Sequence, residues 1–283
     1  MSYALNTISE DDFQAFQHLI YAETGIALNE SKRCLLSSRL NKRLRALQLE
    51  DYLDYYEYLL RRDHGRCEMQ EMINCITTNK TDFLREPHHF QFLTSTIFPQ
   101  ITRRAATGGP RRVRIWCAAS SHGHEPYSLA MTVREYPAFD AAWDVRILAS
   151  DIDTNVLARA EEGIFDIEDL APVGEQRTRR YFDRGTGSFA GKVRARRELR
   201  DLITFRQINL IDEAWPIRAQ FDVIFCRNVM IYFDLPTQRK VVEHLSRHLV
   251  PGGHLMLGHS ESIQWTPSPL RALGNTVFKL SDE

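Results

Sequence analysis

The sequence is short of the features that mark secreted, membrane-spanning or cysteine-zinc proteins. Its 283 residues contain five cysteines, an odd number with no CxxC pair, which argues against a disulfide framework and a cysteine-based zinc site. No stretch of about 18 consecutive apolar residues occurs, so we expect no transmembrane helix and no direct membrane insertion. The first residues lack the basic and apolar regions of a secretory signal. We therefore expect reduced thiols and a cytoplasmic location.

Histidine is more frequent, with ten copies, but its spacing does not predict a metal site. The pairs His88–His89 and His122–His124 lack the helical ligand spacing and the carboxylate neighbours of a metal centre, so we expect no metal. The net charge of -1 and a pI near 6.8, with no aromatic residues interleaved among basic ones, argue against a nucleic-acid partner. The charge is unevenly distributed, however, because residues 31–47 contain six Lys/Arg and no acid.

Residues 1–76 have the periodicity of a small all-α domain. Ser9 precedes Asp12 by three residues, a pattern that resembles a helix N-terminus. The next helix carries an apolar stripe at three- and four-residue spacing, formed by Leu36, Leu40, Leu44 and Leu47. Four basic residues lie off that stripe, Lys32, Arg39, Lys42 and Arg43. Further helices are expected over 51–62 and 69–76, and residues 77–110 are expected to link this domain to the rest.

Strands and helices alternate over residues 111–283, which predicts an α/β domain with a mainly parallel sheet. Apolar strands are expected at 113–116, 145–149, 202–205, 221–226, 254–257 and 276–280, with helices from 126, 154 and 236. The stretch at about 179–205 breaks this alternation, because three glycines precede alternating apolar and basic residues. The pattern predicts a small antiparallel β insertion, although a solvated surface excursion fits it equally. Ligands of such folds bind at the carboxyl ends of the strands.

Small and acidic residues gather where the first two of these strands end. The loop after the first strand contains Ala118, Ala119, Ser120 and Gly123, which allow a ligand to approach the backbone closely. The loop is not GxGxxG, so a dinucleotide site is poorly supported. Asp151 ends the second strand, where a carboxylate can accept hydrogen bonds from two ribose hydroxyls. An acid at a helix N-terminus is the alternative explanation, and it suits Asp153 better. These features predict an adenosine-containing cofactor.

Five segments in order resemble the motifs of the CheR-type chemotaxis receptor glutamate methyltransferases. They are TTNKTDFLRE (77–86), AASSHGHEPYS (118–128), ASDID (149–153), FCRNVMIYFD (225–234) and GHSES (258–262). The resemblance covers nearly the whole chain. It implies a Rossmann-like S-adenosylmethionine-dependent methyltransferase sheet with a small antiparallel β-subdomain, preceded by a small all-α domain. The implied reaction transfers a methyl group from S-adenosylmethionine to receptor glutamates, which forms methyl esters for sensory adaptation.

The resemblance also assigns site residues. Glu125 is placed at the cofactor's ammonium group and Asp151 at its ribose, while Arg85 and Tyr232 are placed near the transferred methyl. The full cofactor set that the motifs imply is Asn79, Thr81, Arg85, Glu125, Asp151, Asn209, Leu210, Arg227 and Asn228. From spacing alone, a surface ion pair with Glu86 or Asp82 is the better explanation of Arg85. Core packing beside Ile231 and Phe233 is likewise the better explanation of Tyr232 from spacing alone.

The chemistry and one departure from the motifs follow. A glutamate carboxylate, with a reference pKa of about 4.3, is already ionised at neutral pH. Methyl transfer to it needs no general base, which agrees with the lack of a convincing Ser/His/Asp or Cys/His arrangement.

His122 and His124 stand where the family commonly has threonine and glutamate. A histidine beside a cationic cofactor would titrate near neutrality unless its pKa is shifted.

The implied partner is the acidic cytoplasmic domain of a chemotaxis receptor. Lys32, Arg39, Lys42 and Arg43 would steer that surface, although a solvated helix face explains them as well. Some family members bind a receptor C-terminal peptide at the β-subdomain, where this chain has Arg194 and Arg196.

Two other functions stay open on the residues alone. One is a methyltransferase for a nucleic acid or small molecule, although the Asn/Asp-Pro-Pro-aromatic motif of amino-methylating enzymes is absent. The other is a non-catalytic module that senses the cofactor.

Overall fold

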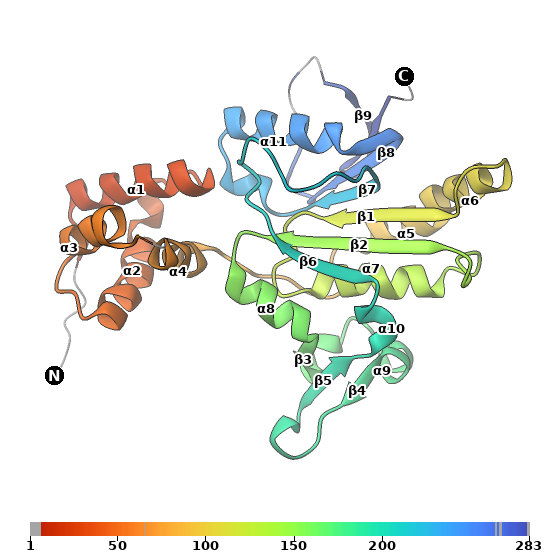
Figure 1. Cartoon of the computed structure of the whole chain (residues 1–283), viewed down its shortest axis with the longest axis horizontal. Helices are drawn as coiled ribbons and strands as arrows, with labels where there is room; N and C mark the ends of the chain where they lie inside the picture. The colour runs from red at the N-terminus through yellow and green to blue at the C-terminus, as the bar shows by residue number, and fades with distance from the viewer. Residues whose placement is uncertain (1–6, 65, 264, 266–267, 282–283) are drawn as a thin grey trace.

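The computed structural model describes residues 7–64, 66–263, 265 and 268–281. A helical domain at the N-terminus lies beside a larger sheet domain, as Figure 1 shows. The helical domain consists of α1 (Glu10–Thr24), η1 (Glu30–Lys32), α2 (Arg33–Leu47), α3 (Tyr52–Glu57), η2 (Tyr58–Arg62) and α4 (Cys67–Ile76). The predicted cap is confirmed, since the Ser9 hydroxyl oxygen accepts the Asp12 N–H at 3.1 Å. No helix among the described residues is long and apolar enough to cross a membrane.

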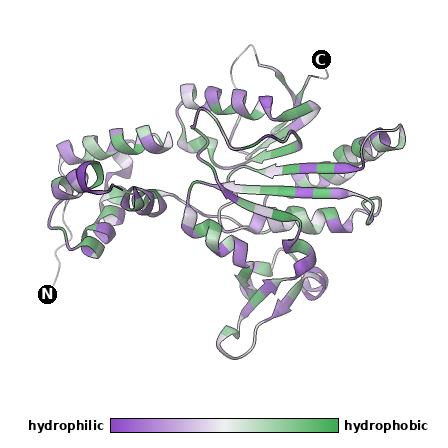
Figure 2. Ribbon diagram, viewed as in Figure 1, coloured by the Kyte–Doolittle hydropathy of each residue, from purple (hydrophilic) through white to green (hydrophobic). Residues whose placement is uncertain are grey.

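The helical domain has its own apolar core. The predicted stripe of α2 faces inward, with Leu36, Leu40 and Leu44 buried against Phe16 and Tyr55 from α1 and α3. Figure 2 shows the corresponding two-faced colouring of these helices, apolar on one side and polar on the other. Because this core is separate from the sheet's cores, the domain behaves as a distinct packing unit.

The sheet domain is built on a seven-stranded mixed sheet in the order β6-β2-β1-β7-β8-β10-β9. Its strands are β1 (Arg112–Cys117), β2 (Asp144–Asp151), β6 (Ile203–Gln207), β7 (Phe221–Cys226), β8 (Leu249–Leu257), β9 (Leu270–Gly274) and β10 (Val277–Leu280). Strands β6, β2, β1, β7 and β8 are parallel to one another, whereas β10 is antiparallel to both β8 and β9. Strand β9 was not predicted. The parallel sheet confirms the expected Rossmann-like class.

Helices cover both faces of the sheet (Figure 1). They include α7 (His124–Glu135), α8 (Thr154–Glu162), η6 (Met230–Tyr232) and α11 (Leu235–Arg247). Successive residues of β1 enter opposite cores, with Ile115 and Cys117 on one side and Trp116 on the other. Asp153 caps α8 by accepting the N–H groups of Asn155 and Val156, as expected.

Residues 77–110 differ from a simple linker. The first ten residues, 77–86, and the last four, 107–110, lie outside helices and strands, and α5 (Pro87–Phe92), η3 (Leu93–Ile97) and α6 (Phe98–Ala106) lie between them. These helices pack onto the sheet because Phe90, Leu93 and Phe98 are buried in the same core as β1.

The predicted β insertion is present as a separate three-stranded antiparallel sheet, the β-subdomain, in the order β3-β5-β4 (Figure 1). It contains β3 (Ile164–Asp166), η4 (Ile167–Leu170), α9 (Glu175–Tyr181), β4 (Phe182–Arg184), η5 (Gly187–Phe189), β5 (Lys192–Ala195) and α10 (Arg197–Arg200). The insertion starts earlier than the expected boundary at about 179, because β3 precedes the hairpin.

Candidate active site

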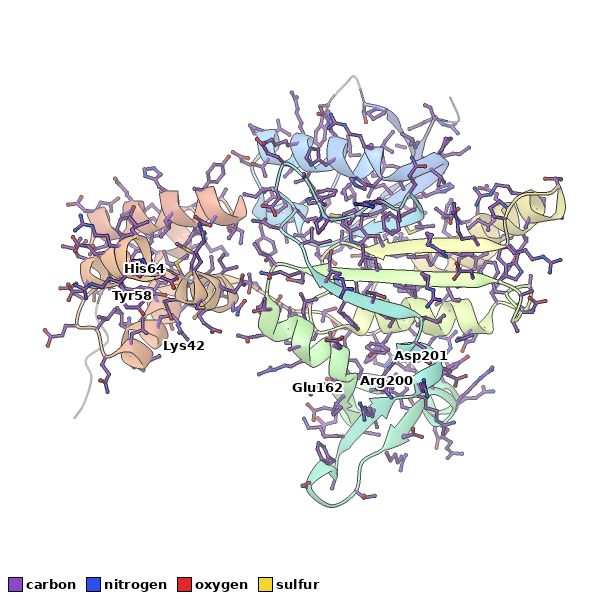
Figure 3. All side chains as sticks on the ribbon, in the orientation of Figure 1. Lys42, Tyr58, His64, Glu162, Arg200 and Asp201 are labelled. Atoms are coloured by element: carbon purple, nitrogen blue, oxygen red, sulfur yellow. The ribbon has the colours of Figure 1, made fainter. Side chains whose placement is uncertain are left out.

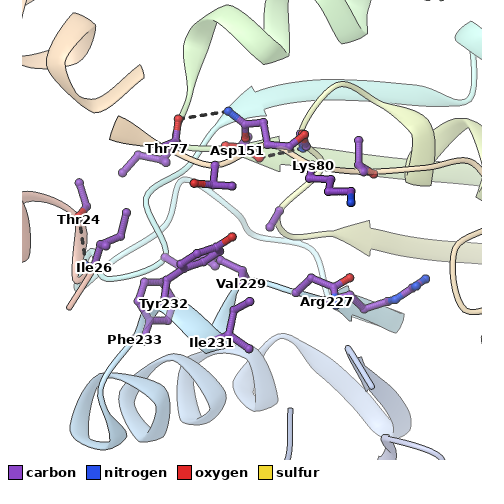
Figure 4. Close-up of a pocket in the computed structure, with 18 of the residues that line it drawn as sticks. Thr24, Ile26, Thr77, Lys80, Asp151, Arg227, Val229, Ile231, Tyr232 and Phe233 are labelled. Atoms are coloured by element: carbon purple, nitrogen blue, oxygen red, sulfur yellow. Dashed lines mark hydrogen bonds between the residues drawn. The ribbon is translucent and has the colours of Figure 1, made fainter. Parts of the chain in front are cut away.

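A pocket of about 370 Å³ lies at the carboxyl ends of β1, β2 and β7, between the sheet domain and the helical domain. Figure 4 shows Thr77 and Asp151 on one side of it and Tyr232 and Phe233 on the other. All nine residues of the predicted cofactor set line this pocket, together with Tyr232. These residues are spread from Asn79 to Tyr232 in the sequence. They meet because the carboxyl ends of neighbouring parallel strands lie at the same edge of the sheet.

Asp151 is the last residue of β2 and is 8% exposed. One carboxylate oxygen accepts the N–H of Ser121 at 2.8 Å and the other accepts the N–H of Asp153 at 3.0 Å. Burial nevertheless raises the pKa of Asp151 to about 6. Each oxygen keeps a further lone pair. The carboxylate is therefore fixed in orientation and suited to accept hydroxyl donors.

Glu125 lies in the first turn of α7, where the helix dipole favours negative charge. The preceding Gly123 has φ +91°, and a side chain there would lie 2.9 Å from Ala160. The Cys117 thiol donates to a Glu125 oxygen at 2.8 Å, and Arg227 lies 3.1 Å from the other. Burial raises the pKa of Glu125 although the guanidinium opposes it. A cationic ligand would favour its ionised form.

Arg227 follows β7 and is almost fully buried. Its guanidinium lies between Glu125 and Glu86, 3.4 Å from the latter, and donates to the Arg85 carbonyl at 2.5 Å. Arg227 thus joins the end of β7, the start of α7 and the 77–86 segment. That segment is fixed at its other end, because Asn79 Nδ2 donates to Asp153 at 2.7 Å and the Asn79 carbonyl accepts from Ser121.

Two protein-family models match the sequence of this chain. The model described as "CheR methyltransferase, SAM binding domain" matches residues 79–278, and "CheR methyltransferase, all-alpha domain" matches residues 11–77. The chain belongs to the CheR methyltransferase family. Its S-adenosylmethionine-binding domain is therefore the sheet domain, and the adenosine cofactor predicted from the loop and Asp151 is S-adenosylmethionine.

The chain is similar over most of its length to named family members. "Chemotaxis protein methyltransferase 2" of Pseudomonas aeruginosa is 44% identical, over 95% of this chain and 93% of that protein. "Probable chemotaxis protein methyltransferase" of Rhizobium etli is 43% identical, over 87% of this chain and 90% of that protein. "Chemotaxis protein methyltransferase" of Escherichia coli is 40% identical, over 98% and 93%. The family resemblance read from the motifs is confirmed.

The site of this CheR methyltransferase fits S-adenosylmethionine in its charges and shape. The carboxylates of Glu125, 14% exposed, and Asp151, which is buried, suit the ammonium and ribose of the cofactor, and Ala118 and Ala119 leave room along the backbone. Asn209 is less free than the motif implied. Its side-chain amide donates to the Glu23 carbonyl at 2.7 Å, so it also ties the sheet domain to α1.

Arg85 and Tyr232 approach the pocket from different elements. Arg85 donates to the Lys80 carbonyl at 3.3 Å, and its Nε lies 4.0 Å from Glu86. The expected ion pair with Glu86 is thus weak, and the guanidinium remains about one-third exposed. Tyr232 ends η6 and lines the pocket rather than the core, whereas its neighbour Phe233 is buried.

The two histidines of the cofactor loop lie outside the pocket lining. His124 is buried against Phe83 and Phe165, with ring centroids 4.7 and 5.2 Å away, and its Nε2 is 3.8 Å from Asp169. Burial lowers the pKa of both His122 and His124. His124 therefore acts as a packing residue between the 77–86 segment and the β-subdomain.

The structure adds residues that the motifs did not assign. Glu86 pairs with Arg227 and accepts from His259 at 3.1 Å and Asn228 at 3.3 Å. Glu86 also groups with His88 and His89, with ligand atoms within 4.8 Å of one another. The expectation that these histidines lack a carboxylate neighbour is therefore wrong, although the Arg227 cation beside Glu86 disfavours a metal.

The six predicted partner-binding residues fall into different settings. Lys32 and Arg39 line the pocket mouth, and Arg39 also donates to Ile76 and Thr78. Lys42, labelled in Figure 3, is exposed on the helical domain. Arg43 instead forms a two-point contact with the buried Glu68, at 2.7 and 2.8 Å.

The remaining two partner-binding residues belong to the β-subdomain. Arg194 and Arg196 are both exposed. Arg194 lies within the central strand β5, and Arg196 directly follows that strand and pairs with Asp183 at 3.0 Å.

Proposed function

We propose that this chain methylates glutamate side-chain carboxylates of chemotaxis receptors in the cytoplasm, using S-adenosylmethionine and producing methyl esters. One observation supports this most. The pocket joins buried acids that suit the cofactor to a mouth lined by cations, which are Lys32, Arg39, Lys80 and Arg85. Cations at the mouth suit an acidic macromolecular substrate. The names of the relatives, chemotaxis protein methyltransferases, agree with this assignment.

The charges of the pocket residues suggest which group of the cofactor or substrate each of them binds. Bound S-adenosylmethionine supplies an electrophilic methyl group on a sulfonium. Glu125 would hold the ammonium of the cofactor and Asp151 its ribose. The substrate carboxylate is ionised at neutral pH, so the protein has to orient it and exclude water rather than remove a proton. Holding two reactants in line contributes roughly 7–11 kcal/mol.

Arg85 and Tyr232 are the residues we assign to that orientation. Within the described part of the chain, Arg85 donates to the Lys80 carbonyl and has a long contact to Glu86, so its guanidinium is available to a carboxylate. Tyr232 places a hydroxyl-bearing ring on the opposite wall from Asp151 (Figure 4). The pair would bracket the reacting centre from two sides.

The receptor would approach along α2. Lys32 ends η1 directly before α2, Arg39 of α2 also lines the pocket, and Lys42 is exposed further along α2. Arg43 has a lesser part in this proposal, because its guanidinium is already paired with Glu68. A receptor C-terminal peptide would add to the β-subdomain at an outer strand, β3 or β4, since β5 is central. Arg194 and Arg196 would then contact the peptide's acidic groups.

The test uses the full chain, methyl-labelled S-adenosylmethionine and receptor-containing membranes. We expect label on the receptor that mild base releases as methanol, because carboxylate methyl esters hydrolyse and methylated amines do not. Membranes whose receptor glutamates are replaced by alanine are the matched control. Base-stable label, or no label on the receptor, would overturn the assignment.

A further inference from the structure

Glu261 is a buried acid behind the pocket that neither the motifs nor the family descriptions assign to a role. It belongs to the loop after β8, is 4% exposed and does not line the pocket. Its carboxylate accepts main-chain N–H groups, from Gly258 at 2.5 Å, Asn228 at 2.9 Å and Ile231 at 3.4 Å. Main-chain donors of this kind stabilise a buried carboxylate and offset part of its desolvation.

The donors come from two different loops. Gly258 belongs to the loop that contains Glu261 itself, whereas Asn228 and Ile231 belong to the loop between β7 and α11. Asn228 has φ +59°, a left-handed conformation that costs energy for a residue with a side chain. Turns of this kind can direct neighbouring N–H groups toward one anion. The carboxylate of Glu261 therefore stabilises a loop conformation that would otherwise be unfavourable.

The space around this carboxylate is closely fitted. A side chain at Gly258 would lie 2.4 Å from Asn228 Nδ2 and 2.8 Å from a Glu261 carboxylate oxygen. Asn228 is also held from the opposite direction, because its side-chain amide donates to Glu86 at 3.3 Å. Backbone and side chain of this one residue are thus fixed by two separate acids.

The loop held by Glu261 contains pocket residues. Arg227 immediately precedes Asn228 and pairs with Glu125, and Tyr232 follows Ile231 directly. We propose that Glu261 is a positioning residue for methyl transfer, which holds the 227–232 segment so that Tyr232 and Arg227 face the pocket. This inference rests on the proposed function, because it assigns Glu261 a part in that reaction.

The first test replaces the carboxylate with an amide of the same shape. In Glu261→Gln, one acceptor becomes an NH₂ group that faces main-chain donors, so the loop must shift. We expect kcat for receptor methylation to fall roughly 30- to 100-fold, since small misplacements at a reacting centre cost that much. Binding of S-adenosylhomocysteine, measured by calorimetry, should weaken less than about fivefold, because Asp151 and Glu125 belong to other elements.

A matched control separates positioning from a general loss of stability. Glu68 is another buried acid, in the helical domain, where it accepts from Arg43 and Tyr55. Glu68→Gln should lower the melting temperature with kcat changed less than about threefold. Glu261→Asp keeps the charge on a shorter side chain and should recover part of the lost kcat. If the Gln variant does not fold, the Asp variant tests the positioning role instead, and its kcat should fall about tenfold.

A double variant tests whether Glu261 acts through Tyr232. If it does, Glu261→Gln should lower kcat by less than about threefold in a Tyr232→Phe background, since the group being positioned is already lost. The proposal would be overturned by near-wild-type turnover of Glu261→Gln, or by an equal kcat loss in Glu68→Gln. It would also be overturned if the kcat losses of Glu261→Gln and Tyr232→Phe multiplied fully in the double variant. Failure of the proposed function has a different signature, because wild-type protein would then leave receptors unmethylated.

Discussion

The two walls of the pocket differ in charge, in burial and in how their side chains are held. The wall from the sheet domain is acidic and less exposed, and main-chain N–H groups fix Asp151. The wall from η1 and α2 is basic and more exposed, with Lys32 in solvent and the apolar Leu35 43% exposed. The sheet wall is suited to a ligand of constant shape, and the helical wall to a large acidic surface.

This difference has an energetic consequence. Buried, hydrogen-bonded charges contribute strongly to affinity and are little affected by salt, whereas exposed charges act mainly on association rate and are screened by salt. Substitutions in the sheet wall should therefore change cofactor binding or turnover. Substitutions in the helical wall should change receptor encounter. Cofactor affinity and kcat/KM for receptor methylation therefore measure the sheet wall and the helical wall separately.

Removing the buried acid of the sheet wall should have the largest effect. Glu125→Ala leaves Arg227 without one of its two carboxylate partners and removes the site for the cofactor's ammonium. Truncating one partner of a desolvated charge pair at a binding site costs about 2–5 kcal/mol, so S-adenosylhomocysteine affinity by calorimetry should fall by a factor of roughly 10². Glu161→Gln, on the exposed side of α8, is the control and should bind normally. Comparable affinity in both variants would contradict the fit of cofactor to this wall.

Arg85→Ala should reduce turnover more than cofactor binding. Its guanidinium lies at the junction of the two walls, and we expect kcat to fall about 30-fold with S-adenosylhomocysteine affinity within about fivefold. Rapid-quench methylation and calorimetry measure the two quantities separately. The exposed Arg103→Ala on α6 is the control. Turnover close to wild type would remove Arg85 from the mechanism.

The pKa of Asp151 predicts a pH dependence of cofactor affinity. Its folded pKa of about 6 is raised above the ordinary 3.8, so ionised Asp151 destabilises the free folded protein as pH rises toward 6. Ribose hydroxyl donors favour the ionised form, and binding releases a proton at low pH. Affinity should therefore rise about tenfold from pH 5 to pH 7 and then level off. The same titration with Asp151→Asn should be flatter; an unchanged slope would argue against this carboxylate as the titrating group.

Charge reversal on the helical wall should give the smallest effect and the strongest salt dependence. Lys32→Glu should lower kcat/KM for receptor methylation about three- to tenfold at low ionic strength and less at high salt. Cofactor affinity should not change. Lys42→Glu, on the adjoining helix α2 but away from the pocket lining, is the matched control and should have a smaller effect. Equal loss of cofactor binding in Lys32→Glu would show that the two walls are not separable.

Much of this protein follows from short-range sequence patterns. The Ser9 and Asp153 caps, the apolar stripe of α2 and the parallel strands are local consequences of residue type and spacing, and all are present. Asp151 at a strand end was readable for the same reason. The helices α5 and α6 were missed because their apolar residues do not form a long periodic pattern, and only packing on the sheet stabilises them.

The tertiary structure alone decided which charges face the pocket and which are used internally. Lys32 and Arg43 look alike in sequence, yet one lies at the mouth and the other is paired with Glu68, 25 residues away. Glu261 and Asn228 are 33 residues apart and meet only because β7 and β8 are neighbours in the sheet. Sequence fixes the residue types and the local periodicity that create the fold. Contacts between distant residues depend on strand order and packing, which no local pattern contains.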